Sequence, residues 1–286
     1  MKTRDGQMAA PPTASDNRRA ISDIGRAAGG ALIFSLPMLM TMELWNIGLY
    51  IERWKLLLFL CSSCPFLIVL ARQMGFEETL SWTDAIWDSL IAVGVALLTC
   101  SAILYMLGIM TPGMDLDNVT GAVAVQLVPA SIGALLARSQ FGASATDGGA
   151  DGCDVTETYP RELLLMAIGA LFLALNVAPT EEMVLISYKI GYLQALIVVV
   201  VSLLIMHGFV FSLGFAGGSK VTDDLTTPRA FLFFTLPGYL ISILLSLYLL
   251  WIFGSLEGLA MGAASKLAIV LAFPASIGAA AARLIL

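Results

Sequence analysis

The chain has 286 residues, of which 58% are hydrophobic and only 13% are charged, and its formal net charge is −6. Soluble domains carry about 25% charged residues, so this composition excludes an ordinary soluble globular protein. Continuous apolar runs of about 20 residues predict membrane-spanning helices rather than the alternating strands of a membrane barrel. The sequence has no basic patch with interleaved aromatic residues, so we expect no nucleic-acid partner.

The first 25 residues are polar and contain Pro11 and Pro12, which predicts a disordered N-terminal tail. Eight apolar runs follow, separated by stretches rich in glycine, proline or acidic residues. They cover residues 27–50, 55–72, 85–110, 118–138, 162–183, 190–213, 230–253 and 262–285. In the fifth run Pro179 precedes two acids, which either end a helix or break one.

The distribution of Lys and Arg predicts the orientation in the membrane. With the N-terminus inside, the outer connections hold only four of the 15 basic residues, namely Arg53, Lys55, Lys189 and Lys266. Cytoplasmic segments of membrane proteins carry the excess of positive charge. We therefore expect both termini in the cytoplasm of a bacterial cell, with the protein in the inner membrane, and an even number of spans.

Two segments recur in the sequence. The ten residues from Pro129 to Arg138, PASIGALLAR, match PASIGAAAAR from Pro274 at eight positions. Aligning Gly30 with Gly169 also places ALIFSLPMLMTMEL over ALFLALNVAPTEEM. The fold class we expect is an all-α polytopic membrane protein of eight transmembrane helices, in two homologous four-helix halves of parallel orientation. The first half covers 26–138 and the second covers 161–286, with a cytoplasmic Gly/Asp-rich linker at 139–160.

The second alignment pairs Thr41 with Thr180 and Glu43 with Glu182. A carboxylate inside an apolar span is costly, so it often marks an ion or proton pathway. Asn46 shares the helical face of Glu43 in the first segment. The plainer alternative is that Glu43 extends to the outer headgroups.

The second acidic segment, NVAPTEE, places Asn176 and Thr180 on one face and adds Glu181 beside Glu182. If the helix runs straight, these acids mark its outer end. If Pro179 breaks the helix, they turn inward towards Glu43. Oxygen ligands of this kind suit a hard cation or a proton relay.

The PASIGA segments supply small residues that let helices approach closely. Their prolines bend a helix and free a carbonyl group. The segments therefore form either a packing seam or the lining of a pathway. The residues concerned are Pro129, Ser131, Gly133, Pro274, Ser276 and Gly278.

Asp88 and His207 are secondary candidates. Asp88 lies near the start of the third span, where it either attracts cations or stabilises the helix start. His207 lies within the sixth span and either titrates or forms a buried hydrogen bond. The sequence has no nucleotide-binding loop, metal-ligand set or catalytic triad, so we expect no metal, no cofactor and no enzyme activity.

The segment GRAAGGALIFSLPMLMTMELWNIG, together with NVAPTEE and PASIGA, resembles a bacterial family of integral membrane proteins of unknown function. The resemblance covers Gly25 to the C-terminus. It implies residence in the bacterial inner membrane and many spans, and it implies no substrate and no site residues.

The residues themselves favour a secondary transporter or channel for a small cation or protons. The alternative is a non-transporting membrane sensor or assembly partner whose small-residue faces serve packing. The expected partners are the lipid bilayer and the ion, and homo-oligomerisation stays open.

Overall fold

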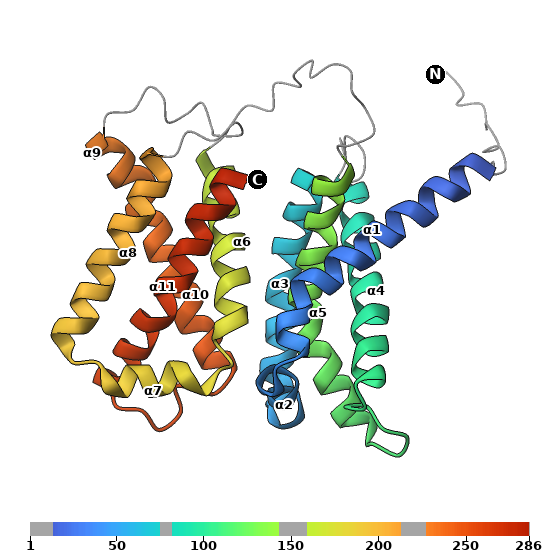
Figure 1. Ribbon diagram of the computed structural model, residues 1–286, viewed down its shortest axis with the longest axis horizontal. Helices are drawn as coiled ribbons and strands as arrows, with labels where there is room; N and C mark the ends of the chain where they lie inside the picture. Colours follow the sequence, from blue (N-terminus) through green and yellow to red (C-terminus); the bar gives the residue numbers. More distant parts are fainter. Residues whose placement is uncertain (1–13, 75–81, 143–158, 213–226, 286) are drawn as a thin grey trace, which may run out of the picture.

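The computed structural model describes residues 14–74, 82–142, 159–212 and 227–285, and every regular element in these ranges is helical. The N-terminal group contains α1 (Ala14–Leu39), α2 (Met42–Tyr50), α3 (Arg53–Met74), α4 (Trp82–Met106) and α5 (Leu116–Gly142). The C-terminal group contains α6 (Tyr159–Val177), α7 (Glu181–Lys189), α8 (Tyr192–Ser212), α9 (Thr227–Ala230), the π-helix η3 (Phe231–Thr235), α10 (Leu236–Ile252) and α11 (Met261–Ile285). The two groups stand side by side (Figure 1).

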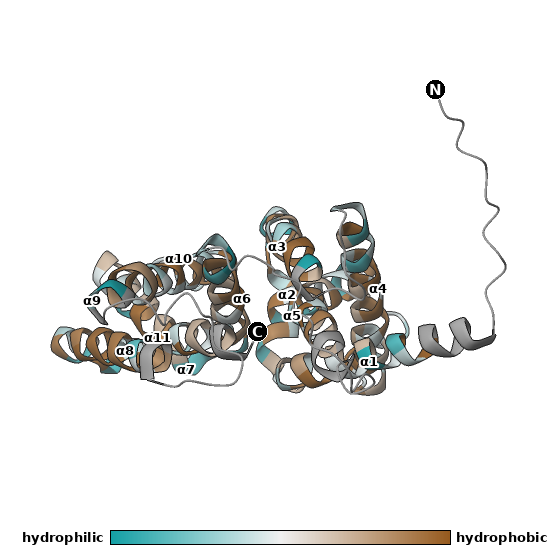
Figure 2. Ribbon diagram, turned by 90° about the horizontal axis from the view of Figure 1, so that it is seen from above, coloured by the Kyte–Doolittle hydropathy of each residue, from teal (hydrophilic) through white to brown (hydrophobic). Residues whose placement is uncertain are grey.

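Seven of the described helices are long and apolar enough to cross a membrane. The bent pair α1 and α2 makes an eighth candidate, with an angle of 82° between its arms. The prediction of an all-α polytopic membrane protein with about eight spans is therefore confirmed. The outer faces of α4 and α8 expose large apolar side chains such as Leu98 and Leu204, as helices do that face lipid. Figure 2 shows hydrophobic residues along the helices of both groups.

Two differences from the expected boundaries concern the chain outside the apolar runs. Helix α1 begins at Ala14, so residues 14–25 are helical rather than part of a disordered tail. Residues 1–13 and 143–158, where the rest of the tail and most of the linker were expected, lie outside the described ranges. Residues 139–142 continue α5.

Each group is organised around its last helix. Helix α5 contacts α1, α2, α3 and α4, and α11 contacts α6, α7, α8 and α10. Within the candidate spans, 78% of the residues in the α5 window are buried, whereas only 17% are buried in α8. Helix α5 is thus a core helix, and α8 presents most of its surface to the bilayer.

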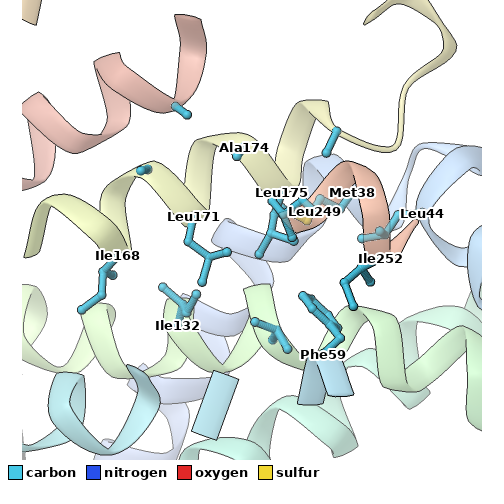
Figure 3. Packing of buried hydrophobic residues seen from close by; sticks show 14 of the residues in the cluster. Met38, Leu44, Phe59, Ile132, Ile168, Leu171, Ala174, Leu175, Leu249 and Ile252 are labelled. Carbon is cyan, nitrogen blue, oxygen red and sulfur yellow. The ribbon is translucent and has the colours of Figure 1, made fainter. Parts of the chain in front are cut away.

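Buried apolar side chains also join the two groups. Ile168 and Leu171 of α6 point towards Ile132 of α5, and Phe59 of α3 lies near Ile252 of α10 (Figure 3). The rings of Phe34 of α1 and Phe172 of α6 also meet edge to face, 4.9 Å between centroids. The two groups therefore share one hydrophobic core.

Candidate functional site: two interrupted helices

The first helical segment is interrupted between α1 and α2. Pro37 lacks an N–H group, which removes one helical hydrogen bond near the end of α1. Thr41 then adopts an extended conformation, with φ −92° and ψ 138°, and becomes the N-cap of α2. Its hydroxyl donates to the Met38 carbonyl at 3.1 Å. The break therefore directs α2 across the end of the bundle instead of along it (Figure 1).

The C-terminal group contains the same local structure. Thr180 has φ −80° and ψ 140° and is the N-cap of α7, and its hydroxyl donates to the Val177 carbonyl at 2.9 Å. Pro179 lies in the break between α6 and α7, so the helix does not run straight through this segment. The expected inward turn of the acids is not found, because Glu181 and Glu182 are exposed. Helices α2 and α7 lie at the same end of the molecule (Figure 1).

The predicted acids occupy the first turns of these short helices. Glu43 is half-buried in α2, whereas Glu181 and Glu182 are exposed at the start of α7. Negative charge at a helix N-terminus is stabilised by the helix dipole. In the described part of the chain, none of these three acids belongs to an ion pair. In the same ranges, no group of three or more His, Cys, Asp and Glu residues is arranged to hold a metal ion.

The structure places the predicted supporting ligands individually. The Asn176 side-chain amide donates to the Phe172 carbonyl one turn earlier at 2.8 Å, so it forms a hydrogen bond within α6. Asn46 is half-buried on α2.

A basic side chain donates a hydrogen bond to a backbone carbonyl at the C-terminal end of each short helix. Arg53 donates to the Gly48 carbonyl at 3.1 Å and forms an ion pair with Asp117 of α5 at 2.6 Å. In the C-terminal group, Lys266 of α11 donates to the Ile190 carbonyl at 3.1 Å. These cations neutralise helix C-termini. Sequence reasoning counted them only as outer positive charges, because their partners are distant in the chain.

The small residues of the PASIGA segments pack against the first helix of their own group. A Cβ atom built on Gly30 would lie 2.5 Å from the Gly133 carbonyl oxygen, and one built on Gly169 would lie 2.2 Å from the Gly278 carbonyl oxygen. Backbones meet at these points. Ser276 donates to the Phe273 carbonyl, whereas the buried Ser131 hydroxyl has no partner in the described residues.

The prolines of these segments interrupt neither helix. Pro129 lies inside the continuous helix α5, and Pro274 lies inside α11. Pro129 is buried and Pro274 is half-buried.

The secondary candidates lie apart from the interrupted helices. Asp88 is half-buried and lies six residues after the start of α4 at Trp82. The His207 ring lies 3.0 Å from the hydroxyl of Thr235, which belongs to the π-helix η3. His207 is therefore part of a hydrogen-bonded contact between α8 and η3.

A charged contact between the two groups was missed by sequence reasoning. Lys55 of α3 forms an ion pair with Glu257, which follows α10, at 2.5 Å. The Lys55 side chain is only 7% exposed, whereas that of Glu257 is 67% exposed. A cavity of about 200 Å³ adjoins the pair. The contact joins positions 202 residues apart, so local sequence patterns give no signal for it.

Comparisons with known proteins place the chain in a family without supplying an activity. No curated protein and no solved structure matches it. A family model described as "Putative integral membrane protein (DUF2391)" matches residues 23–286. This match covers all the described helices except the start of α1, and it confirms the resemblance expected from the sequence. The chain therefore belongs to this family of integral membrane proteins of unknown function.

Proposed function

We propose that the protein is a transporter or channel for a small cation or protons. The observation that carries this proposal is the break before a short helix in each group, with a threonine N-cap and an acid in the first turn. Helices α1 and α2 form one bent candidate span, whereas α6 is long enough to span by itself before the break to α7. Interrupted helices expose backbone carbonyls and helix ends, and transporters use such groups to bind ions within the membrane.

Glu43 is the carboxylate best suited to the pathway. Its side chain is half-buried, in a segment that passes the length and hydropathy criteria of a span. A carboxylate in this setting can exchange a proton for a cation, because desolvation favours its neutral form and a nearby cation favours its charged form. Glu182 is the counterpart in α7 and would receive ions from the exposed end of the molecule.

We also propose that the two groups arose by duplication and are related as parallel repeats. Matching contacts support this relation: Gly30 meets Gly133, and their aligned partners Gly169 and Gly278 meet in the same way. The basic residue that binds the C-terminal end of the short helix comes from a different helix in each group. Lys266 of α11 aligns with Gly121 of α5, which has no side chain to donate. In the N-terminal group Arg53 of α3 donates the hydrogen bond to the end of the short helix instead.

The exposure of Glu181 and Glu182 favours a second candidate function. In that function the protein is a membrane sensor or assembly partner, and the acids of α7 form part of a surface outside the bilayer. The two candidates differ in a measurable way, because only the first requires net ion movement.

The test is ion flux into liposomes that contain the purified full-length protein and a pH-sensitive dye. Gradients of H⁺, Na⁺, K⁺ and Ca²⁺ are imposed in turn. The proposal expects flux above that of protein-free liposomes, and expects Glu43→Gln to abolish most of it. Asp115→Asn, which neutralises an exposed acid just before α5, is the matched control. Absence of flux from folded protein, or equal flux in wild type and Glu43→Gln, would reject the proposal.

The proposed location is the bacterial inner membrane, with both termini in the cytoplasm. Helices α2 and α7 then lie at the outer end, where only four basic residues occur. Fluorescent-protein fusions at either terminus should fluoresce in a bacterial host, while alkaline phosphatase fusions at the same sites should be inactive. The opposite pattern would reverse the orientation.

A further inference from the structure

The cavity between the two groups is lined by residues from both of them. Tyr50, Ile51, Glu52 and Lys55 contribute from the N-terminal group, and Ile252, Phe253, Gly254 and Glu257 from the C-terminal group. Ligand sites often form at such boundaries between packed units. None of these residues belongs to the acid pair considered above, so this cavity is a separate feature of the molecule.

The Lys55 ammonium group has more donors than acceptors. An ammonium group carries three N–H donors. Among the described residues, Glu257 Oε1 is the one acceptor that receives a hydrogen bond from Lys55 Nζ. The Trp54 ring contributes only a cation–π contact, 5.8 Å from the ring centroid. The remaining donors of this largely buried side chain can bind further oxygen atoms, and a ligand in the adjoining cavity is placed to supply them.

The acidic residues that line the cavity indicate which second group its ligand carries. Glu52 and Glu257 both line it, so a purely anionic ligand would meet two negative charges beside one positive charge. A purely cationic ligand would leave the Lys55 donors unmatched. A ligand with an oxyanion beside an ammonium group satisfies both requirements, with its oxyanion on Lys55 and its ammonium group at the two carboxylates.

The size and position of the cavity restrict this ligand. A volume of about 200 Å³ is the share of roughly seven water molecules in the liquid, which suits a group of fewer than about ten heavy atoms. Trp54 and Trp251 pack edge to face beside it, 5.5 Å between centroids. Tryptophan and tyrosine side chains concentrate at the level of lipid headgroups.

The loop after α10 is shaped to bring Glu257 to this place. Gly254 has a φ of +77°, and the Glu257 amide donates to its carbonyl at 3.1 Å in the turn that follows. Other residues adopt this backbone conformation only at a cost. The returning loop thus places the Glu257 carboxylate at Lys55.

From these observations we infer that the cavity binds a small zwitterion, in which a carboxylate or phosphate group lies next to an ammonium group. Two sources carry this chemistry: a soluble zwitterion and the phosphoethanolamine headgroup of a lipid. In both, Lys55 holds the oxyanion, and Glu52 and Glu257 hold the ammonium group.

Binding is tested on the full-length protein in nanodiscs made of phosphatidylglycerol. Glycine and O-phosphoethanolamine are the soluble zwitterionic probes for isothermal titration. Inorganic phosphate, which is only anionic, and ethylamine, which is only cationic, are the matched controls. For the lipid source, native mass spectrometry compares the retention of phosphatidylethanolamine and phosphatidylglycerol. Binding of a soluble zwitterion identifies the first source, and selective retention of phosphatidylethanolamine alone identifies the second.

Three variants assign the binding to the cavity. Lys55→Met and Glu257→Gln should each weaken binding about tenfold or more, the effect of losing one charge-assisted hydrogen bond. Lys189→Met, at an exposed lysine of α7, should leave it within about twofold. Glu257→Gln preserves side-chain size and decides the matter if Lys55→Met does not fold.

Three results would overturn the inference. They are absence of binding by every zwitterion, equal affinity for the purely anionic or purely cationic probe, and equal loss in Lys189→Met and Glu257→Gln. The ion-flux test depends on Glu43, so either proposal can fail without the other.

Discussion

The substitution Gly30→Ala tests the closest helix contact of the N-terminal group. A Cβ atom at Gly30 would lie 2.0 Å from the Ala137 Cβ and 2.5 Å from the Gly133 carbonyl oxygen. Neither contact can be relieved by rotating a flexible side chain, because one partner is a Cβ atom and the other is backbone. Helices α1 and α5 must therefore move apart along a seam that is otherwise tightly packed.

The expected loss of stability follows from two opposing effects. Overpacking typically costs about 1–3 kcal/mol, and this contact is severe enough for the upper part of that range. Alanine recovers up to about 1 kcal/mol because it favours the helix more than glycine does. The free energy of unfolding of Gly30→Ala should thus fall by about 1–2 kcal/mol. Separation of the helices also removes dispersion contacts, which hold helices together within lipid.

The neighbouring residue supplies the control for this measurement. Gly29 lies in the same helix, and a Cβ atom built on it meets no atom within 4 Å. Unfolding is followed in detergent micelles by circular dichroism as sodium dodecyl sulfate is added. Gly29→Ala should be as stable as the wild type or slightly more stable. If Gly30→Ala matched Gly29→Ala, the close approach of α1 and α5 would be refuted.

Three further predictions concern contacts that hold the short helices and the seam between the groups. Lys266→Met should lower the free energy of unfolding by about 1–2 kcal/mol, because the Ile190 carbonyl loses a charged donor. The control Lys189→Met should change it by less than about 0.5 kcal/mol. Equal losses in the two variants would contradict a stabilising role of the bond from Lys266 to Ile190. Ser62 and Tyr248 share a hydrogen bond between α3 and α10. A double-mutant cycle with Ser62→Ala and Tyr248→Phe should therefore give a coupling energy of about 0.5–1.5 kcal/mol. Strictly additive losses would show that the bond does not form. Gly254→Ala should cost about 1–2 kcal/mol because φ is +77° there, and thermal unfolding that is unchanged would argue against the turn.

The sequence by itself determined the class of protein and the places of most helices. Long apolar runs cannot leave their backbone groups unpaired in lipid, so they become helices whatever their neighbours are. The paired threonines and acids mark the places where the two short helices begin, but the sequence predicted one unbroken span over residues 27–50, and the break before α2 was not expected. These signals are local, since each depends on neighbouring residues along the chain.

Tertiary structure decided which prolines interrupt a helix. Pro65, Pro129 and Pro274 lie inside continuous helices, whereas the chain turns soon after Pro37. Proline alone therefore does not predict a break. The first break is favoured by the fit of α2 on α5, where the backbones of Gly48 and Gly121 meet.

Tertiary structure alone also formed the cavity and brought the charged residues together beside it. Lys55 and Glu257 are each unremarkable in the sequence, as a basic residue at the start of a span and an acid in a glycine-rich loop. They become an ion pair, with Lys55 largely buried, only because α3 packs against α10 and the loop after α10 turns back. The energy of such a pair depends on its distance and on the exclusion of water. Both are properties of the packed fold, and the order of residues along the chain does not contain them.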